Sequence, residues 1–356
     1  MAKGTGRGEM PGQGPGSSAD AAVGDARPDL DPSHPQSPTE LSKPSLLAVV
    51  KRALKQFKHD NLTDLAAALT YYGVLSIVPG LIVLISLLGL LSPDVTAQIT
   101  DQVEQAAPGS AAEFVRTLIE QAQANQTGAS ISALAGLAIA LWSASGYVAA
   151  FMRASNVIYA IGEGRPIWKT IPIRLGVTIL AVLLLLLSAV IVVVSGPVAT
   201  QIGDLLGVGE ALLLAWRIAK WPVLLIIVSA LLAILFWASP NAKQSGIKWV
   251  SPGGVIAVLL VLIASALFAF YVTNFSSYDK TYGALAGVVI FLVWLWITNI
   301  AVLLGAEINA ELDHGIAIAK GMPEDVEPFA QPRDTRKLDE IDKAAVKDAQ
   351  AHKHQR

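Results

Sequence analysis

The chain alternates long apolar stretches with short polar ones. Stretches of about 20 apolar residues are long enough to cross the hydrocarbon core of a bilayer as helices. The pattern predicts six membrane spans, at residues 65–91, 131–152, 173–194, 222–237, 250–272 and 283–306. The expected fold class is all-α: a polytopic membrane protein with six transmembrane helices and amphipathic helices at both surfaces.

The last predicted span contains no charged residue and is followed at once by Glu307. Gly283 and Gly287 put small residues on one face, which predicts close packing with another helix. A carboxylate at position 307 is unfavourable in hydrocarbon, so it must face protein or lie in the interface. A basic residue such as Arg153 or Arg174 is one expected partner for it.

The first predicted span contains Pro79 near its middle. Proline removes a backbone hydrogen bond, so we predict a kink or a break there. Transporters place interrupted helices at substrate sites, and purely structural kinks are at least as common. Polar groups of the first, second and last spans make up a candidate polar cavity: Tyr72, Ser76, Pro79, Arg153, Asn156, Asn299 and Glu307.

The segment before the first span divides in two. Residues 1–45 are rich in Gly, Pro, Ser and Asp, which predicts a disordered tail. Residues 46–64 place apolar and basic side chains on opposite sides of a helix: Leu47, Val50, Leu54 and Phe57 against Lys51, Arg52, Lys55 and Lys58. This pattern indicates an interfacial helix whose partners are membrane lipids with anionic headgroups. A helix that docks on a partner protein is the alternative.

Charge in the loops predicts the orientation. Bases collect before the first span and after the second and fourth, whereas acids collect after the first and third. By the positive-inside rule both termini are expected in the cytoplasm, with residues 313–356 as a polar tail that could form a helix over 333–350. Arg217 and Lys220 are an exception, and either snorkel to the outer interface or bind an anion within the bundle.

Composition supports a membrane protein and narrows the chemistry. Of 356 residues, 53% are hydrophobic and 15% charged, with a net charge of −2, and the mean hydropathy is +0.53. The chain has no cysteine, which excludes disulfides and thiol catalysis, and its 5 histidines lack metal-ligand spacing within a span. We expect no metal, no cofactor and no nucleic acid partner; a homo-oligomer is compatible with the sequence.

Three stretches carry a family resemblance. The closing stretch contributes Tyr282, Gly283, Gly305, Ala306, Glu307 and Asn309. The first span contributes Asp64, Ala67, Ala68, Tyr72, Ser76 and Pro79. The second contributes Trp142, Ser143, Ser145 and Asn156. Together they resemble the YihY/BrkB family of bacterial inner-membrane proteins, historically mislabelled ribonuclease BN. The resemblance covers roughly residues 48–314 and implies six α-helical spans in the bacterial cytoplasmic (inner) membrane.

The resemblance also implies a function in transport or in envelope lipid handling. The sequence offers neither a metal constellation nor a basic, aromatic RNA surface, so we do not expect an enzyme. The first expectation is a transporter or flippase of an ion, a small solute or an envelope lipid. A non-transporting membrane scaffold in envelope maintenance is the alternative.

Overall fold

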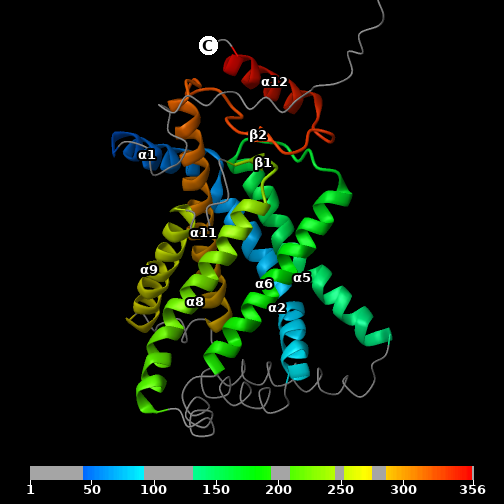
Figure 1. Ribbon diagram of the computed structural model, residues 1–356, viewed down its shortest axis with the longest axis vertical. Helices are drawn as coiled ribbons and strands as arrows, with labels where there is room; N and C mark the ends of the chain where they lie inside the picture. Colours follow the sequence, from blue (N-terminus) through cyan, green and yellow to red (C-terminus); the bar gives the residue numbers. More distant parts are fainter. Residues whose placement is uncertain (1–42, 92–130, 194–208, 245–251, 275–285, 355–356) are drawn as a thin grey trace, which may run out of the picture. The chain divides into compact units, whose positions relative to one another are not determined.

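The computed structural model describes residues 43–91, 131–193, 209–244, 252–274 and 286–354. All of them belong to one unit, Pro35–Arg356. Figure 1 shows the elements: α1 (Lys43–His59), α2 (Leu62–Leu91), α5 (Ile131–Ile158), α6 (Ile167–Val193), α8 (Glu210–Ala238), β1 (Ala242–Lys243), α9 (Pro252–Asn274), α11 (Ala286–Ala319), β2 (Gln331–Pro332) and α12 (Glu340–His354). The two short strands pair antiparallel, Ala242 with Pro332 and Lys243 with Gln331.

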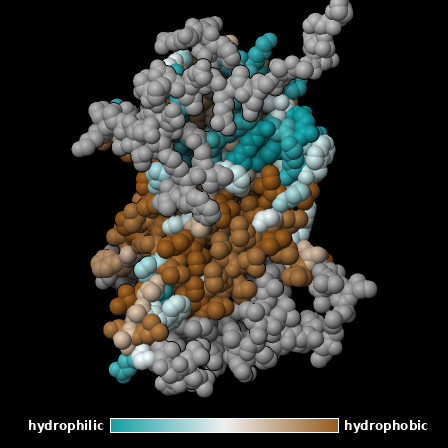
Figure 2. Space-filling model, viewed as in Figure 1, coloured by the Kyte–Doolittle hydropathy of each residue, from teal (hydrophilic) through white to brown (hydrophobic). Residues whose placement is uncertain are grey.

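Five helices of the described part are long and apolar enough to cross a membrane. Their apolar segments are Gly136–Ile158, Ile167–Val192, Glu210–Ala238, Pro252–Val272 and Gly287–Ala319. Large apolar side chains such as Leu183, Ile226 and Leu262 are exposed. Figure 2, in the same view as Figure 1, shows hydrophobic residues across the middle of the molecule and hydrophilic residues at the end where α12 lies. Because so wide an apolar surface needs lipid around it, this is a helical, multi-pass membrane protein.

The first predicted span is not broken. α2 runs as one helix of 30 residues with Pro79 inside it. Proline removes one hydrogen bond of the helix, and the bonds on either side keep the backbone helical. Of the predicted kink or break, the break was therefore wrong, and the kink stays a prediction.

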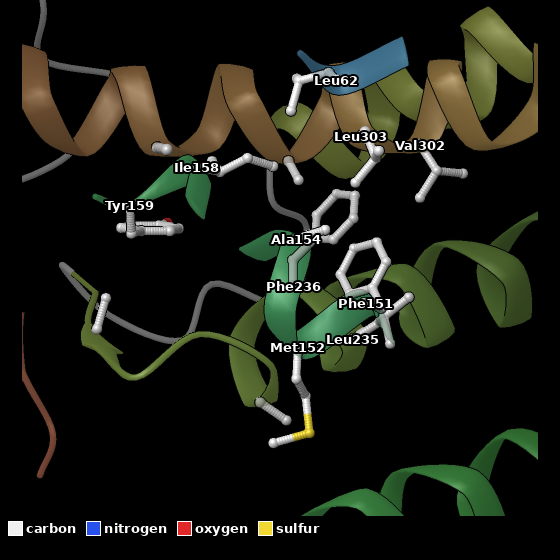
Figure 3. Packing of buried hydrophobic residues seen from close by; sticks show 14 of the residues in the cluster. Leu62, Phe151, Met152, Ala154, Ile158, Tyr159, Leu235, Phe236, Val302 and Leu303 are labelled. Atoms are coloured by element: carbon white, nitrogen blue, oxygen red, sulfur yellow. The ribbon is translucent and has the colours of Figure 1, made fainter. Parts of the chain in front are cut away.

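The buried core joins four helices at one level. The Phe151 ring of α5 stacks on the Phe236 ring of α8, with ring centroids 5.9 Å apart. Figure 3 shows Leu303 of α11 pointing toward these two rings. Leu62 at the start of α2 belongs to the same cluster. Because all four side chains are buried, this contact fixes how α2, α5, α8 and α11 meet.

Two glycines bring α9 and α11 into backbone contact. A Cβ atom on Gly305 would lie 2.5 Å from the Ala257 Cβ and 2.5 Å from the Gly253 carbonyl oxygen. The Gly253 N–H donates to Asn309 Oδ1 at 2.9 Å, which gives the first turn of α9 a side-chain partner. The predicted packing residue Gly283 lies outside the described residues. A Cβ on Gly287 would meet no described atom within 4 Å.

Helix α1 packs on α11 through Val49 and Ala53. Arg52 also turns toward α11, where its Nε lies 2.7 Å from Glu311 Oε2. The apolar stripe predicted from spacing is instead exposed: Leu47, Val50 and Leu54. A helix on the membrane surface presents such exposed apolar side chains to lipid, so the interfacial role of α1 stays a prediction.

Asn241 fastens the C-terminal segment to the end of α8. Its Nδ2 donates to the carbonyls of Gly162 at 3.1 Å and Asp334 at 2.8 Å. Its Oδ1 accepts the Asp334 N–H at 3.1 Å, and its own N–H donates to Asn156 Oδ1 at 2.7 Å. Residues 331–334 are therefore part of the folded unit, and the helix expected over 333–350 begins later, as α12.

Arg165 caps the same helix end. Its Nη1 donates to the Ala238 carbonyl at 3.2 Å, and its Nη2 donates to the Ser239 carbonyl at 2.7 Å. Two further hydrogen bonds, both 2.7 Å, join the guanidinium to Glu163. Carbonyls at a helix C-terminus lack intrahelical partners and carry partial negative charge, so a buried cation is stabilised there.

Two carboxylates make this C-terminal packing depend on pH. Burial raises the pKa of Glu163, but the hydrogen bonds and charge of Arg165 outweigh it, so the net pKa is lowered. Hydrogen bonds from Arg336 and Lys169 lower the pKa of Asp334. Both values are lower when folded than the ordinary value of about 4. The stability that they contribute is therefore complete above about pH 4 and is lost as the pH falls below it.

We expect hydrogen exchange of residues 331–342 to accelerate as the pH falls from about 6 to about 3, after correction for the intrinsic rate. Residues 226–236 of α8 should keep their protection. Asp334→Asn should lose much of this pH dependence, because it removes one of the two carboxylates. Glu340→Gln, whose side chain is 89% exposed, is the matched control and should keep it. Exchange that does not change with pH in the wild type would contradict this reading.

Candidate functional site

One buried face of α11 carries polar residues at intervals of about one or two turns: Asn299, Glu307, Glu311 and His314. Steps of three or four residues keep side chains on one side of a helix. Asn299 and Glu307 lie about 12 Å apart along the axis, from the rise per residue. The sequence analysis selected two of these four residues; the same spacing from Glu307 could have found the other two.

Asn299 joins three helices through hydrogen bonds. The Tyr147 hydroxyl of α5 donates to Asn299 Oδ1 at 2.8 Å. Asn299 Nδ2 donates to Thr70 Oγ1 of α2 at 3.1 Å, and that hydroxyl donates to the Ala66 carbonyl at 2.8 Å. Such a satisfied network within a membrane bundle specifies how its helices fit together. Tyr147 and Thr70 were missed because single hydroxyls are common in apolar helices.

Glu311 and His314 connect α11 to α1 and to the segment after α11. Glu311 accepts a hydrogen bond from Arg52 Nε at 2.7 Å. His314 stacks on the Phe329 ring with centroids 4.6 Å apart, and its Nδ1 lies 3.5 Å from Glu311 Oε2. Neither ring nitrogen forms a hydrogen bond within the described part of the chain, and the residue is 4% exposed.

Glu307 differs from Glu311, the other acid on this face. It is 0% exposed, and neither carboxylate oxygen has a hydrogen-bond partner among the described residues. The charges that act most on it are acidic, namely Asp60, Glu311 and Glu327. A buried carboxylate without a base or a donor is strongly unfavourable while ionised. While it is buried, Glu307 must therefore be neutralised by a bound proton or a bound cation.

The two bases expected near Glu307 lie elsewhere. The Arg153 guanidinium sits over the Tyr72 ring, 5.2 Å from its centroid. Arg174 donates from Nη2 to the Trp142 carbonyl at 2.9 Å. The expected pairing of Glu307 with either arginine was wrong, because Arg153 is engaged with Tyr72 of α2 and Arg174 with Trp142 of α5.

The other residues of the candidate cavity fall into separate groups. Asn156 lies with Asn241 at the end of α8, and its Nδ2 donates to Glu163 at 3.0 Å. Ser76 donates to the Tyr72 carbonyl at 2.7 Å and reaches the Ser143 carbonyl at 3.5 Å. Pro79 is partly buried in α2. Tyr72 contacts Arg153 through its ring and Ser76 through its carbonyl, whereas Asn299 is hydrogen-bonded to Tyr147 and Thr70.

Comparison with known proteins shows the family. The model of the family Virulence factor BrkB matches residues 53–327. The chain belongs to this family. It is 32% identical over 247 residues to YfkH of Bacillus subtilis (strain 168), whose name is ribonuclease-like, covering 69% of this chain and 88% of that protein. No solved structure matches.

Two further relatives are named as membrane proteins. UPF0761 membrane protein VP0125 of Vibrio parahaemolyticus serotype O3:K6 (strain RIMD 2210633) is 32% identical over 281 residues, 76% of this chain and 83% of that one. UPF0761 membrane protein RC1_0578 of Rhodospirillum centenum (strain ATCC 51521 / SW) is 30% identical over 273 residues, 76% of this chain and 58% of that one.

The described residues of the closing stretch that resembles the BrkB family have different roles in the structure. Gly305 permits the contact between α9 and α11, and Asn309 bonds the first turn of α9. Ala306 is buried and small. Among the described residues of the stretch, Glu307 is the one whose buried side-chain oxygens have no hydrogen-bond partner. It is therefore the member of the stretch for which a functional role is the better explanation.

Proposed function

We propose that this BrkB family protein is a transporter or flippase of an ion, a small solute or an envelope lipid in the bacterial cytoplasmic membrane. In this proposal α2 is a sixth span, since 30 residues extend about 45 Å as a helix. Bases such as Lys51, Lys169 and Lys243 gather at one end of the helices, which supports cytoplasmic termini.

Glu307 is the observation that carries the proposal. An unpaired, fully buried carboxylate has to take up a proton or a cation to become neutral, and it can exchange that ligand only when it reaches water. A protein in which Glu307 alternates between a buried and a water-accessible position can couple the movement of a proton or a cation to that of a substrate. A purely structural role would instead favour an apolar residue at that position.

The hydrogen bonds of Asn299 are the contact at which we propose that this conformational change takes place. They tie α11 to α2 and α5 about 12 Å from Glu307 along α11, through Thr70 and Tyr147. Hydrogen-bonded contacts between helices can exchange partners, whereas interdigitated side chains resist gradual sliding.

Helix α1 supports a position on the membrane surface. Leu47 and Leu54 are exposed on one stripe, and Lys51 and Lys55 are exposed beside it. This combination suits the boundary between acyl chains and anionic headgroups, which we propose as the partner of α1. We also propose that the chain is neither an enzyme nor a nucleic acid binder, although one relative carries a ribonuclease-like name.

Reconstitution tests the proposal. Purified protein in liposomes should move protons, followed with trapped pyranine, or move NBD-labelled phosphatidylglycerol between leaflets, followed by dithionite quenching, faster than protein-free liposomes do. If folded protein moves neither probe, transport of these classes is contradicted. A scaffold would instead copurify with partners in fixed ratio and would lose its cellular function on deletion of residues 46–58.

A further inference from the structure

Arg174 of α6 is held rigidly against α5. Its Nε donates to the Ser145 carbonyl at 3.0 Å, and its Nη2 donates to the Trp142 carbonyl at 2.9 Å. Its guanidinium also stacks on the Trp142 ring, 4.6 Å from the centroid. Trp142 is 50% exposed, so this arginine lies beside the outer surface of the helices and not in the core.

Arg153 of α5 lies on the same side, where α2, α5 and α6 meet. It is exposed, it donates from Nη1 to the Ala149 carbonyl at 3.2 Å, and it covers the Tyr72 ring. Both arginines contact one side of α5, because their hydrogen-bond acceptors Trp142, Ser145 and Ala149 follow one another at steps of three or four residues and lead to Arg153 itself. Within the described part of the chain neither forms an ion pair with a carboxylate.

Both arginines belong to helices that cross the membrane. Arg153 precedes the end of α5 at Ile158 by about 8 Å, and Arg174 follows the start of α6 by about 10 Å, at the helical rise per residue. Trp168 at the start of α6 is exposed, as expected for a side chain at headgroup level. From that depth the exposed Arg153 side chain can reach the phosphate layer, and the Arg174 guanidinium lies deeper, on Trp142 and Ser145 of α5.

We propose that Arg153 and Arg174 form a binding site for the phosphate group of an anionic phospholipid, on the membrane-facing side of α2, α5 and α6. Two uncompensated guanidinium groups match one phosphodiester, because each can donate paired hydrogen bonds to its oxygens. Tyr72 and Trp142 fix the two cations from behind and provide apolar surface for the first part of the acyl chains. The site rests on the membrane position of these helices and does not require transport.

The test is lipid binding to purified protein in uncharged detergent, with NBD-labelled phosphatidylglycerol and NBD-labelled phosphatidylcholine as probes. The wild type should bind the anionic lipid about fivefold or more tightly, and Arg153→Gln/Arg174→Gln should remove most of that preference. Lys320→Gln is the control, because it removes an exposed base just after α11 that has no part in the proposed site. It should keep the preference. The lysine pair Arg153→Lys/Arg174→Lys should keep part of it, since charge remains while the forked geometry is lost.

Two outcomes would overturn the assignment. One is an unchanged preference in the folded glutamine double variant, or in both single variants if the double variant does not fold. The other is displacement of the labelled lipid by inorganic phosphate together with equal binding of both lipids, which would indicate a site for a free anion. Loss of binding without loss of translocation, or the reverse, separates this site from the proposed transport function.

Discussion

Gly305→Leu is expected to prevent stable packing of α9 on α11. Even a single Cβ at this position would lie 2.5 Å from both the Ala257 Cβ and the Gly253 carbonyl oxygen, and the latter belongs to a backbone that cannot rotate away. Overpacking usually costs 1–3 kcal/mol and more where backbone has to move, so we expect a loss of about 3 kcal/mol or more. The fraction of protein that stays monodisperse after heating in detergent should fall well below that of the wild type.

Gly176→Leu is the matched control for this substitution. It lies within another membrane helix, α6, where a Cβ would meet no described atom within 4 Å. It should leave heat resistance unchanged or slightly higher, because leucine is the better helix former. Wild-type heat resistance of Gly305→Leu would show that α9 and α11 are not in this contact.

Sequence reasoning located the membrane helices, and several of these helices extend beyond the predicted spans. α8 begins at Glu210 and not at 222, and α11 continues to Ala319 and not to 306. An apolar stretch marks where lipid surrounds a helix, whereas the helix itself ends where its backbone hydrogen bonds end. Beyond Glu307, α11 stays helical because α1 packs on it through Val49 and Ala53. No local sequence pattern in residues 307–319 predicts that contact with α1.

The candidate site was predicted in part for a similar reason. Asn299 and Glu307 stand out in an apolar helix, since uncompensated polarity there is rare. Their partners come from sequence positions far away, such as Thr70 and Tyr147 for Asn299, and only the packing of three helices selects them. The sequence offered Arg153 as a neighbour of Glu307, and it could not show that the carboxylate has no hydrogen-bond partner among the described residues.

Glu307→Gln is expected to abolish transport while leaving the fold intact. The substitution keeps the shape of the side chain and removes the group that binds a proton or a cation. Losing a charge-dependent interaction of about 1.5–3 kcal/mol corresponds to a rate lower by about tenfold or more. Stability should be unchanged or higher, because no hydrogen bond among the described residues is lost and glutamine is neutral without a bound proton or cation.

The most direct measurement is the initial rate of proton flux and of NBD-phosphatidylglycerol translocation in liposomes with equal amounts of folded protein. Wild type and the exposed control Glu340→Gln should transport at the same rate, and Glu307→Gln should fall to the rate of protein-free liposomes with the heat resistance of the wild type. Transport by Glu307→Gln at the wild-type rate would contradict a working role for this carboxylate.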